Sequence, residues 1–335
     1  MPGRFRSILK KLALSLVTTL VCLVIVEVVL RNFFPIYEAT IPDAFEYDPE
    51  LGTRFKSGIH MFRTTDFQDE ERTDQAGTFN FQEDWSSYPA LAVAVGDSYT
   101  QGTGLPADIS YPGQLDLLLN YAPDKGYQPK IGVVNLGVPG YGGEQSLIYL
   151  DRWWQANGSK AKYILYMGCD NDHDDDQLFK SGYRHTHLVA GNPRYEPFVR
   201  PLRFFATNVQ LTLRIKLAMA TLKRRSLGVD GGPNQGPPIS QLESSVLERL
   251  SVFARDHNAK LVLSWSDDSS SYDWAKDWAA QNNIAFADWR SGVASVRQTI
   301  PELPLENNHS GGHHRGWVNH IIAEQYAAAI TETSK

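Results

Sequence analysis

Five short apolar runs, at 91–95, 131–135, 163–167, 261–264 and 284–288, alternate with stretches of helical periodicity. Short apolar runs bounded by turn residues are typical of strands that are buried on both faces. Since helical stretches separate these runs, the order strand, helix, strand predicts parallel pairing with right-handed crossovers. The sequence therefore predicts an α/β fold, a three-layer sandwich with a central parallel sheet.

The expected helices show a one-sided apolar pattern. Their spacing is clearest where apolar residues recur at intervals of four, four and three, at Leu242, Val246, Leu250 and Phe253. Such residues share one face of a helix, which would pack on the sheet. A last helix over 317–330 is expected to close the fold.

A second strong feature is the apolar stretch 12–30, which has nineteen residues and one ionisable side chain, Glu27. About 20 such residues cross a bilayer as a helix. We expect the Glu27 carboxylate to snorkel to the interface rather than to meet a partner helix. The basic residues that precede this stretch are Arg4, Arg6, Lys10 and Lys11.

These basic residues orient the stretch. The positive-inside rule predicts a cytoplasmic tail over 1–11, and no small-residue cleavage site of the A-x-A kind follows the apolar stretch. We therefore expect an uncleaved, single-pass transmembrane anchor over 12–30, with the rest of the chain across the membrane. A cleaved signal peptide is the alternative.

Composition excludes two classes of protein. The net charge of −6 argues against a nucleic-acid-binding surface. The basic cluster lies beside the expected anchor, where it would contact lipid headgroups. The two cysteines, Cys22 and Cys169, rule out a disulfide framework.

The remaining chain divides into three parts. Residues 31–88 lack a sustained period and are expected to form a linker and an irregular lead-in. The domain proper is expected over 89–335, with a helical and loop insertion at about 177–241. This insertion holds an amphipathic stretch at 209–224 and the glycine- and proline-rich GVDGGPNQGPP, which together suggest a helical lid with a mobile loop.

Polar, glycine-containing segments follow the first three strands, where sites form in open α/β sheets. The first is GDSYTQG, in which Ser98 would open a helix after the turn at Gly96. A serine placed there can act as nucleophile and supply a backbone N–H to an oxyanion. Alternatively, Ser98 or Thr100 is only the N-cap of that helix.

The next two segments are NLGVPGYGG at 135–143 and GCDNDHDDD at 168–176. Glycines in the first permit close approach of a ligand to the backbone, and Asn171 in the second could donate its amide to an oxyanion. The alternating aspartates of the second segment also suggest a calcium loop, but the glycine and glutamate of such a loop are missing.

Together these three segments resemble the blocks of the SGNH (GDSL) hydrolase superfamily. The resemblance implies a flavodoxin-like three-layer fold, Ser98 as nucleophile, and an oxyanion hole made by Ser98, Gly140 and Asn171. The expected anchor and the segments GDSYTQGTGL and VVNLGVPGYGGEQ resemble, more narrowly, membrane-anchored bacterial members of this superfamily. Some relatives of that kind act on acyl groups of cell-surface polysaccharides.

The C-terminal block departs from the family pattern of aspartate, two residues, then histidine. In LENNHSGGHHRGWVNH, the spacing into the last helix favours His313 as the base, with Ser310 at the place of the aspartate. Alternatively His309 is the base and Glu306 the acid, and His314 is a third candidate. The acceptor that orients the base could be a backbone carbonyl, Glu306 or Asp288.

A zinc site built from His309, His313, His314 and His320 is a weaker alternative, since two glycines interrupt the helical spacing of the first two and no cysteine joins them. The leading hypothesis is a serine-dependent ester hydrolase or O-acyltransferase that acts on acyl, in particular acetyl, esters of a small molecule or carbohydrate. It needs no metal or organic cofactor. The expected location is the bacterial inner membrane with a periplasmic catalytic domain. The alternative is a catalytically inactive glycan-binding or scaffold protein of an export complex.

Overall fold

A computed structural model describes residues 2–36, 44–63, 68–79, 85–122, 124–127, 130–182, 196–226, 241–307 and 312–333. The chain divides into two compact units, which are treated separately. One unit comprises Met1–Glu38 and Pro197–Gly231, and the other comprises Ala39–Glu196 and Gly232–Lys335.

The larger unit is built on a five-stranded sheet of order β11-β10-β9-β5-β8, in which every neighbouring pair is parallel. The strands are β5 (Ala90–Gly96), β8 (Ile131–Asn135), β9 (Ala161–Gly168), β10 (Lys260–Trp265) and β11 (Ala285–Phe286). All five predicted strands are therefore confirmed, with shifts of a few residues at their ends.

Alternate side chains of β5 enter two different cores. Leu91, Val93 and Val95 belong to one buried cluster, and Ala92 and Ala94 belong to the other. Successive side chains of a strand point to opposite faces, so both faces of the sheet are covered. This confirms the predicted three-layer α/β sandwich.

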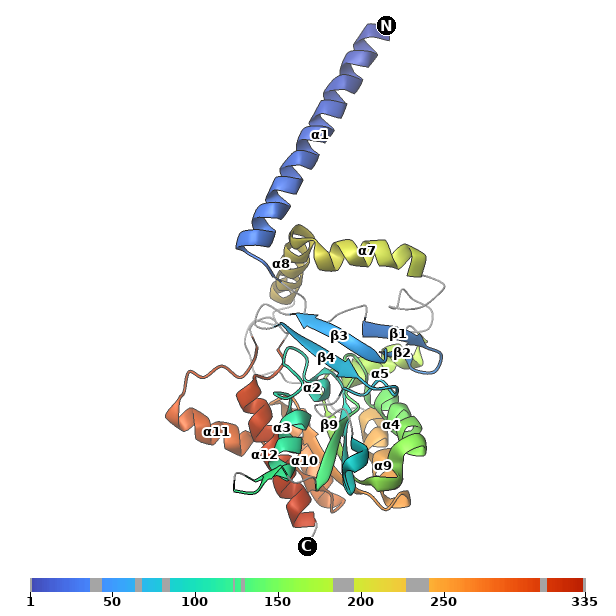
Figure 1. The fold of residues 1–335 in the computed structure, drawn as a ribbon, viewed down its shortest axis with the longest axis vertical. Helices are drawn as coiled ribbons and strands as arrows, with labels where there is room; N and C mark the ends of the chain where they lie inside the picture. Colours follow the sequence, from blue (N-terminus) through green and yellow to red (C-terminus); the bar gives the residue numbers. More distant parts are fainter. Residues whose placement is uncertain are drawn as a thin grey trace. The chain divides into compact units, whose positions relative to one another are not determined.

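Helices form the outer two layers, as Figure 1 shows. One face is covered by α4 (Gly143–Asn157) and α9 (Gln241–Asp256), and the other by α3 (Tyr111–Asn120), α11 (Arg290–Thr299) and α12 (Gly316–Thr333). The remaining elements of this sandwich are α2 (Ser98–Gln101), α5 (Asp172–Lys180), α10 (Ser270–Gln281), η2 (Trp85–Ser87), η3 (Gly158–Lys160), β6 (Tyr121–Ala122) and β7 (Gly126–Tyr127).

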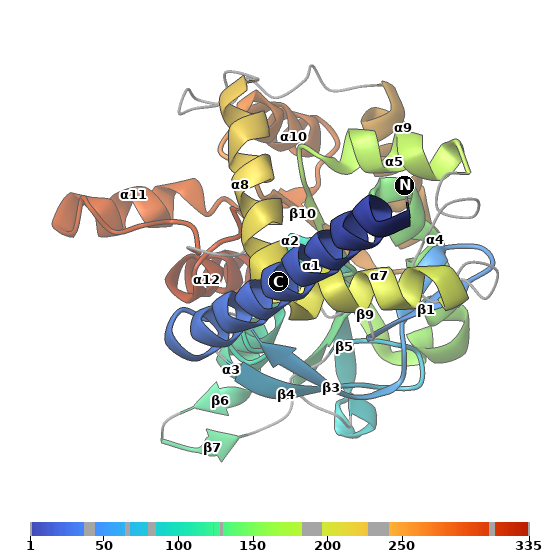
Figure 2. The ribbon, with the colours of Figure 1, turned by 90° about the horizontal axis from the view of Figure 1, so that it is seen from above.

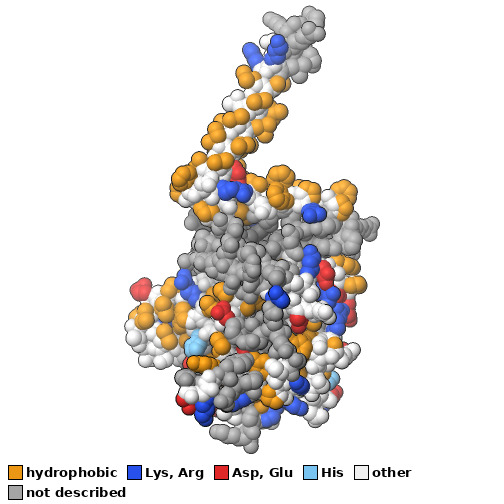
Figure 3. Space-filling view, in the orientation of Figure 1, with side chains coloured by type: hydrophobic (Ala, Val, Ile, Leu, Met, Phe, Trp, Pro, Cys, Tyr) orange, Lys and Arg blue, Asp and Glu red, His pale blue; other side chains and the backbone are white. Residues whose placement is uncertain are grey.

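The smaller unit contains α1 (Pro2–Phe33), α7 (Glu196–Asn208) and α8 (Gln210–Ser226). Within α1, Lys10–Phe33 is long and apolar enough to cross a membrane, which no other helix in the described part of the chain is. Figure 3 shows its apolar side chains along the helix, and Figure 2 shows α7 and α8 meeting at a corner. The glycine-rich loop of the predicted lid lies outside the described residues.

The environment of Glu27 differs from the expected snorkelling. Its two carboxylate oxygens accept hydrogen bonds from the backbone N–H groups of Gln210 (3.0 Å) and Leu211 (3.1 Å) at the start of α8. The first N–H groups of a helix have no partner within the helix, so a carboxylate is a favourable acceptor there. Glu27 therefore meets a partner helix.

The lead-in also differs from the irregular structure that was expected. It forms two hairpins, one of β1 (Phe45–Asp48) with β2 (Gly52–Phe55) and one of β3 (Gly58–Arg63) with β4 (Gln68–Thr73). Their sequences, FEYD, GTRF, GIHMFR and QDEERT, are not compact apolar runs, which is the signal that identified the strands of the sheet.

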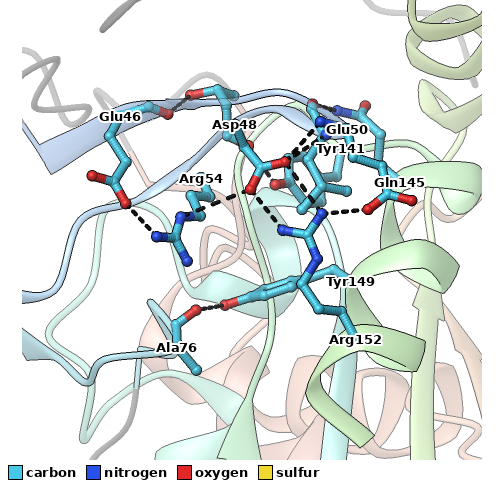
Figure 4. Close-up of polar contacts among 11 residues, drawn as sticks. Glu46, Asp48, Glu50, Arg54, Ala76, Tyr141, Gln145, Tyr149 and Arg152 are labelled. Carbon is cyan, nitrogen blue, oxygen red and sulfur yellow. Dashed lines mark hydrogen bonds and ion pairs between the residues drawn. The ribbon is translucent and has the colours of Figure 1, made fainter. Parts of the chain in front are cut away.

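Side chains of α4 and the preceding loop hold the first hairpin (Figure 4). Arg152 reaches the nearly buried Asp48 carboxylate at 2.6 Å, and Gln145 donates to the Leu51 carbonyl at 2.7 Å. The Tyr141 hydroxyl donates to the Thr53 carbonyl. Because Asp48 also accepts from the backbone of residues 50 and 51, its carboxylate is fully used in closing the hairpin.

Close packing at Gly137 positions the helix that carries Ser98. A Cβ atom at Gly137 would lie 2.2 Å from the backbone N of Gln101 and 2.6 Å from the carbonyl carbon of Thr100. Both atoms belong to the backbone of α2, so no side chain can move aside to make room.

We predict that Gly137→Ala lowers the free energy of unfolding by about 1–3 kcal/mol, because α2 and the loop after β8 must separate. Thermal unfolding followed by tryptophan fluorescence would measure it. Gly292→Ala is the control, since a Cβ there would meet only the Ile321 side chain in close contact, at 2.5 Å. Equal stability of both variants would contradict the prediction.

Candidate active site

Ser98 is the first residue of α2, directly after the turn that ends β5. The N-cap of this helix is Asp97, whose Oδ1 accepts a hydrogen bond from the backbone N–H of Tyr99 at 2.9 Å. Neither Ser98 nor Thr100 is the cap. The Ser98 hydroxyl is therefore not used as a cap; it can donate to Asp97 Oδ2 at 3.3 Å, and it has one closer partner.

That partner is His313. The Oγ of Ser98 lies 2.7 Å from Nε2 of His313, although 215 positions separate the two residues in the chain. Tyr99 supports this pair, because its ring centroid lies 4.8 Å from that of His313 and its hydroxyl donates to the Gly312 carbonyl at 3.3 Å. A serine and a histidine within hydrogen-bond reach are the core of a nucleophile–base arrangement.

His314, the third candidate base, has a different place. It is buried, with Nε2 2.8 Å from the Ser266 carbonyl oxygen, to which it can only donate. Burial lowers the pKa of His314 to about 4, so the ring is neutral at neutral pH. Its ring packs against Tyr99 and Trp289, which makes it a support for the His313 segment.

The other candidates around the base are placed only in part. His309 and Ser310 lie outside the described residues. Glu306 pairs with His314 in an antiparallel bridge, and its Oε2 lies 3.6 Å from the position of a Cβ on Gly312. Asp288 is engaged elsewhere, since it accepts from the Tyr272 hydroxyl at 2.6 Å and pairs with Lys276 at 2.6 Å.

The loops after β5 and β8 lie side by side at the carboxyl edge of the sheet. The backbone N–H of Leu136 donates to Ala94 at 2.8 Å, and that of Val138 donates to Gly96 at 3.3 Å. Gly140 comes two residues later with a φ of +77°, a conformation that favours glycine.

Asn171 follows β9 at the same edge and precedes α5. Its side chain is exposed, and one N–H of its amide donates to Asp175 Oδ2 at 2.7 Å. An amide has two N–H donors, so this bond fixes the orientation of the group and uses one of them.

The carboxyl group of Asp97 is buried, and its Oδ2 lies 3.3 Å from Ser98 Oγ. Burial, together with the charges of Asp267 and Asp175, raises the pKa of Asp97 to about 7. The Asp267 carboxylate accepts from the Asp170 backbone N–H at 2.9 Å and from the Ser266 hydroxyl at 2.8 Å. It thereby joins the loops after β9 and β10.

Sequence reasoning did not identify Asp267 as part of the site. The signal was present, because Asp267 comes shortly after the predicted strand 261–264, the position that singled out the other loops. The aspartates of the suggested calcium loop have separate partners: Asp170 accepts from Trp265 at 2.8 Å, and Asp172 accepts from Tyr166 at 3.0 Å. Within the described residues, no three His, Cys, Asp or Glu side chains are grouped to hold a metal ion.

Comparisons with known proteins give structural likenesses only. No family model and no curated protein matches the chain. Among solved structures, it is similar to the esterase EstA from Pseudoalteromonas sp., at 13% identity and a TM-score of 0.40, covering 73% of this chain and 98% of that one.

Two further solved structures are similar to the chain. A G-D-S-L family protein from Desulfitobacterium hafniense DCB-2 has 12% identity and a TM-score of 0.38, with 72% of this chain and 99% of that one covered. A catalytic mutant of an acetylxylan esterase from Geobacillus stearothermophilus has 13% identity and a TM-score of 0.38, with 72% and 94% covered.

The low pKa of His314 leads to a pH-dependent stability. Between pH 6.5 and about 4 the unfolded chain binds a proton at His314 that the folded chain does not, so acid weakens the fold in that window. The loss is about 3 kcal/mol over the window. We predict that His314→Gln, which keeps a donor for Ser266, removes this part of the pH dependence.

Urea unfolding of both proteins at several pH values measures the effect. The difference between the unfolding free energies of the two proteins reports on His314 alone, because the buried carboxyl groups are the same in both. If the unfolding free energies of both proteins fall equally from pH 6.5 to pH 4, the buried neutral ring of His314 does not cause the loss of stability.

Proposed function

We propose that the chain is a membrane-anchored serine esterase of the SGNH type, with Ser98 as nucleophile and His313 as base. The distance of 2.7 Å between Ser98 Oγ and His313 Nε2 carries this proposal. The order of the motifs along the chain and the parallel sheet that gathers them support it. An inactive scaffold, the alternative from sequence, gives no reason for this pair to be in contact.

In the first half of the reaction, Ser98 attacks the ester carbonyl. Nε2 of His313, unprotonated in the tautomer with hydrogen on Nδ1, accepts the hydroxyl proton as the new C–O bond forms. The tetrahedral intermediate then collapses, the alkoxide leaves, and His313 returns the proton to it. The products are an alcohol and an acyl group on Ser98.

Three donors are proposed for the oxyanion of that intermediate: the backbone N–H groups of Ser98 and Gly140 and the side-chain amide of Asn171. All three residues follow strands that end at one edge of the sheet. The bond from Asn171 to Asp175 holds the amide before substrate arrives, and donors held in advance need no reorganisation in the transition state.

In the second half, His313 removes a proton from water, the resulting hydroxide attacks the acyl group, and Ser98 leaves with the proton from His313. A sugar hydroxyl in the place of water would make the same site an O-acyltransferase. Acetyl esters of a cell-surface or exported polysaccharide are the proposed substrates, on the strength of the narrower resemblance described above.

We also propose that α1 remains on the mature protein as an inner-membrane anchor, with the catalytic domain in the periplasm. The basic residues before the apolar stretch support this orientation. The hydrogen bonds from Gln210 and Leu211 to Glu27 support retention, because cleavage after the apolar stretch would remove the acceptor of two α8 donors.

For the nucleophile, we predict that Ser98→Ala abolishes labelling by a fluorophosphonate probe and lowers turnover of an aryl acetate on the order of 10³-fold or more. The control is Ser291→Ala, which removes a hydroxyl from an exposed serine on α11. It should label and turn over like the wild type. A wild-type protein that folds but never labels would favour the scaffold alternative.

Glu306 is proposed as the group that orients His313 in place of the missing aspartate. Its bridge with His314 and its approach to Gly312 bring a carboxylate beside the His313 segment. Loss of an orienting carboxylate in a serine–histidine site lowers kcat strongly and changes the affinity for substrate little.

We predict that Glu306→Gln lowers kcat on the order of 10²–10⁴-fold with KM little changed, while Glu306→Asp retains part of the activity. Steady-state hydrolysis of an aryl acetate gives both constants. Glu302→Gln, an exposed glutamate nearby in the chain, serves as the control. Wild-type kcat in Glu306→Gln would assign the orienting role to another acceptor.

A further inference from the structure

The helix α7 has a strongly one-sided composition and leaves its apolar side uncovered. Four large apolar side chains within eight residues are exposed, by 58% to 73% of their area: Phe198, Leu202, Phe204 and Phe205. Phe198, Leu202 and Phe205 share one face, while Arg200 lies on the other. An exposed apolar face of this size on a single helix marks an interaction surface.

The attachment of α7 and α8 to α1 indicates what covers that face. Glu27 accepts from the first residues of α8, and Arg31 donates to the carbonyl of Asn208, the last residue of α7. Gln210 also exchanges two hydrogen bonds with the backbone of Ile36, at 2.8 Å each.

These bonds set the depth of the corner between α7 and α8. Glu27 and Arg31 lie inside the stretch Lys10–Phe33 that is able to cross a membrane, close to its C-terminal end. The corner is therefore held at the level where α1 leaves the bilayer. Figure 3 shows apolar side chains along α1 and again on the side of α7 and α8 from which α1 rises.

The length of α7 decides between crossing the bilayer and lying on it. Its 13 residues extend about 20 Å at 1.5 Å per residue, too short for a hydrocarbon core of about 30 Å. A short helix with one apolar and one charged face lies in the plane of the interface.

We propose that α7 is an interfacial helix that inserts Phe198, Leu202 and Phe205 into the outer leaflet beside α1, and that its partner is the lipid surface. This inference rests on the proposed anchor. The smaller unit would then contact the membrane through α7 as well as through α1.

Depth-dependent fluorescence quenching of the full chain in lipid vesicles tests this proposal. Phe198→Cys, Leu202→Cys and the opposite-face control Arg200→Cys are made with Cys22→Ala and labelled with an environment-sensitive fluorophore. Cys169 is buried and stays in place. Quenchers are lipids with a nitroxide near the headgroup or near the chain end, and iodide in the water.

Probes at 198 and 202 should be quenched by the headgroup-level nitroxide at least about twofold more than the probe at 200, and should be protected from iodide. Quenching by iodide as strong as at position 200 would overturn the proposal. So would protection from both iodide and lipid nitroxides, since a second copy or a soluble protein would then cover the helix.

Wild-type protein labelled at its native Cys22 separates the two proposals. Cys22 is exposed within α1, and its probe should be quenched by the nitroxide near the chain end. If Cys22 is quenched and positions 198 and 202 are not, the anchor stands and the interfacial helix fails. If Cys22 is not quenched, the anchor itself fails.

Discussion

Parallel pairing of the five strands determines where chemistry can occur in this protein. All strands of the sheet end at one edge, so the segments that follow them meet although they are distant in sequence. Ser98 after β5, Asn171 after β9 and Asp267 after β10 share that edge, and the chain returns with His313 before α12. The contact between Ser98 and His313 follows from this arrangement, since the two residues are far apart in the sequence and only the fold brings them together.

The carboxyl group of Asp97 is what leaves the Ser98 hydroxyl available. It caps α2 through the N–H of Tyr99, a role that a serine at the start of a helix would otherwise fill. Burial, together with the charges of Asp267 and Asp175, raises the pKa of Asp97 to about 7, so protonation near neutral pH removes an unfavourable buried charge. The same carboxyl group can accept a hydrogen bond from the Ser98 hydroxyl at 3.3 Å, so a group that titrates near neutral pH lies beside the proposed nucleophile.

The sheet was predictable from sequence because each strand is a compact apolar run, and period and length suffice to identify such runs. Motif order predicted a role for Ser98, and the spacing into the last helix favoured His313 over the other histidines without excluding them. The first hairpin of the lead-in was not predictable, since side chains of α4 and its preceding loop hold it, Arg152 on Asp48 for example. His314 shows the same limit: only packing against Trp289 and the bond to Ser266 distinguish it from His313.

Glu27 is the clearest case in which tertiary structure overrides a local expectation. A carboxylate in an apolar stretch is costly unless it finds partners, and snorkelling to water is the solution open to an isolated helix. Here the free N–H groups of α8 and the guanidinium of Arg31 supply those partners at 3.0 to 3.1 Å. Glu27 is thus the residue through which the apolar helix α1 is joined to α8. Because α7 and α8 come from the middle of the chain, the larger unit connects to the smaller unit at three places in sequence, after residues 38, 196 and 231. A simple tether would need only one.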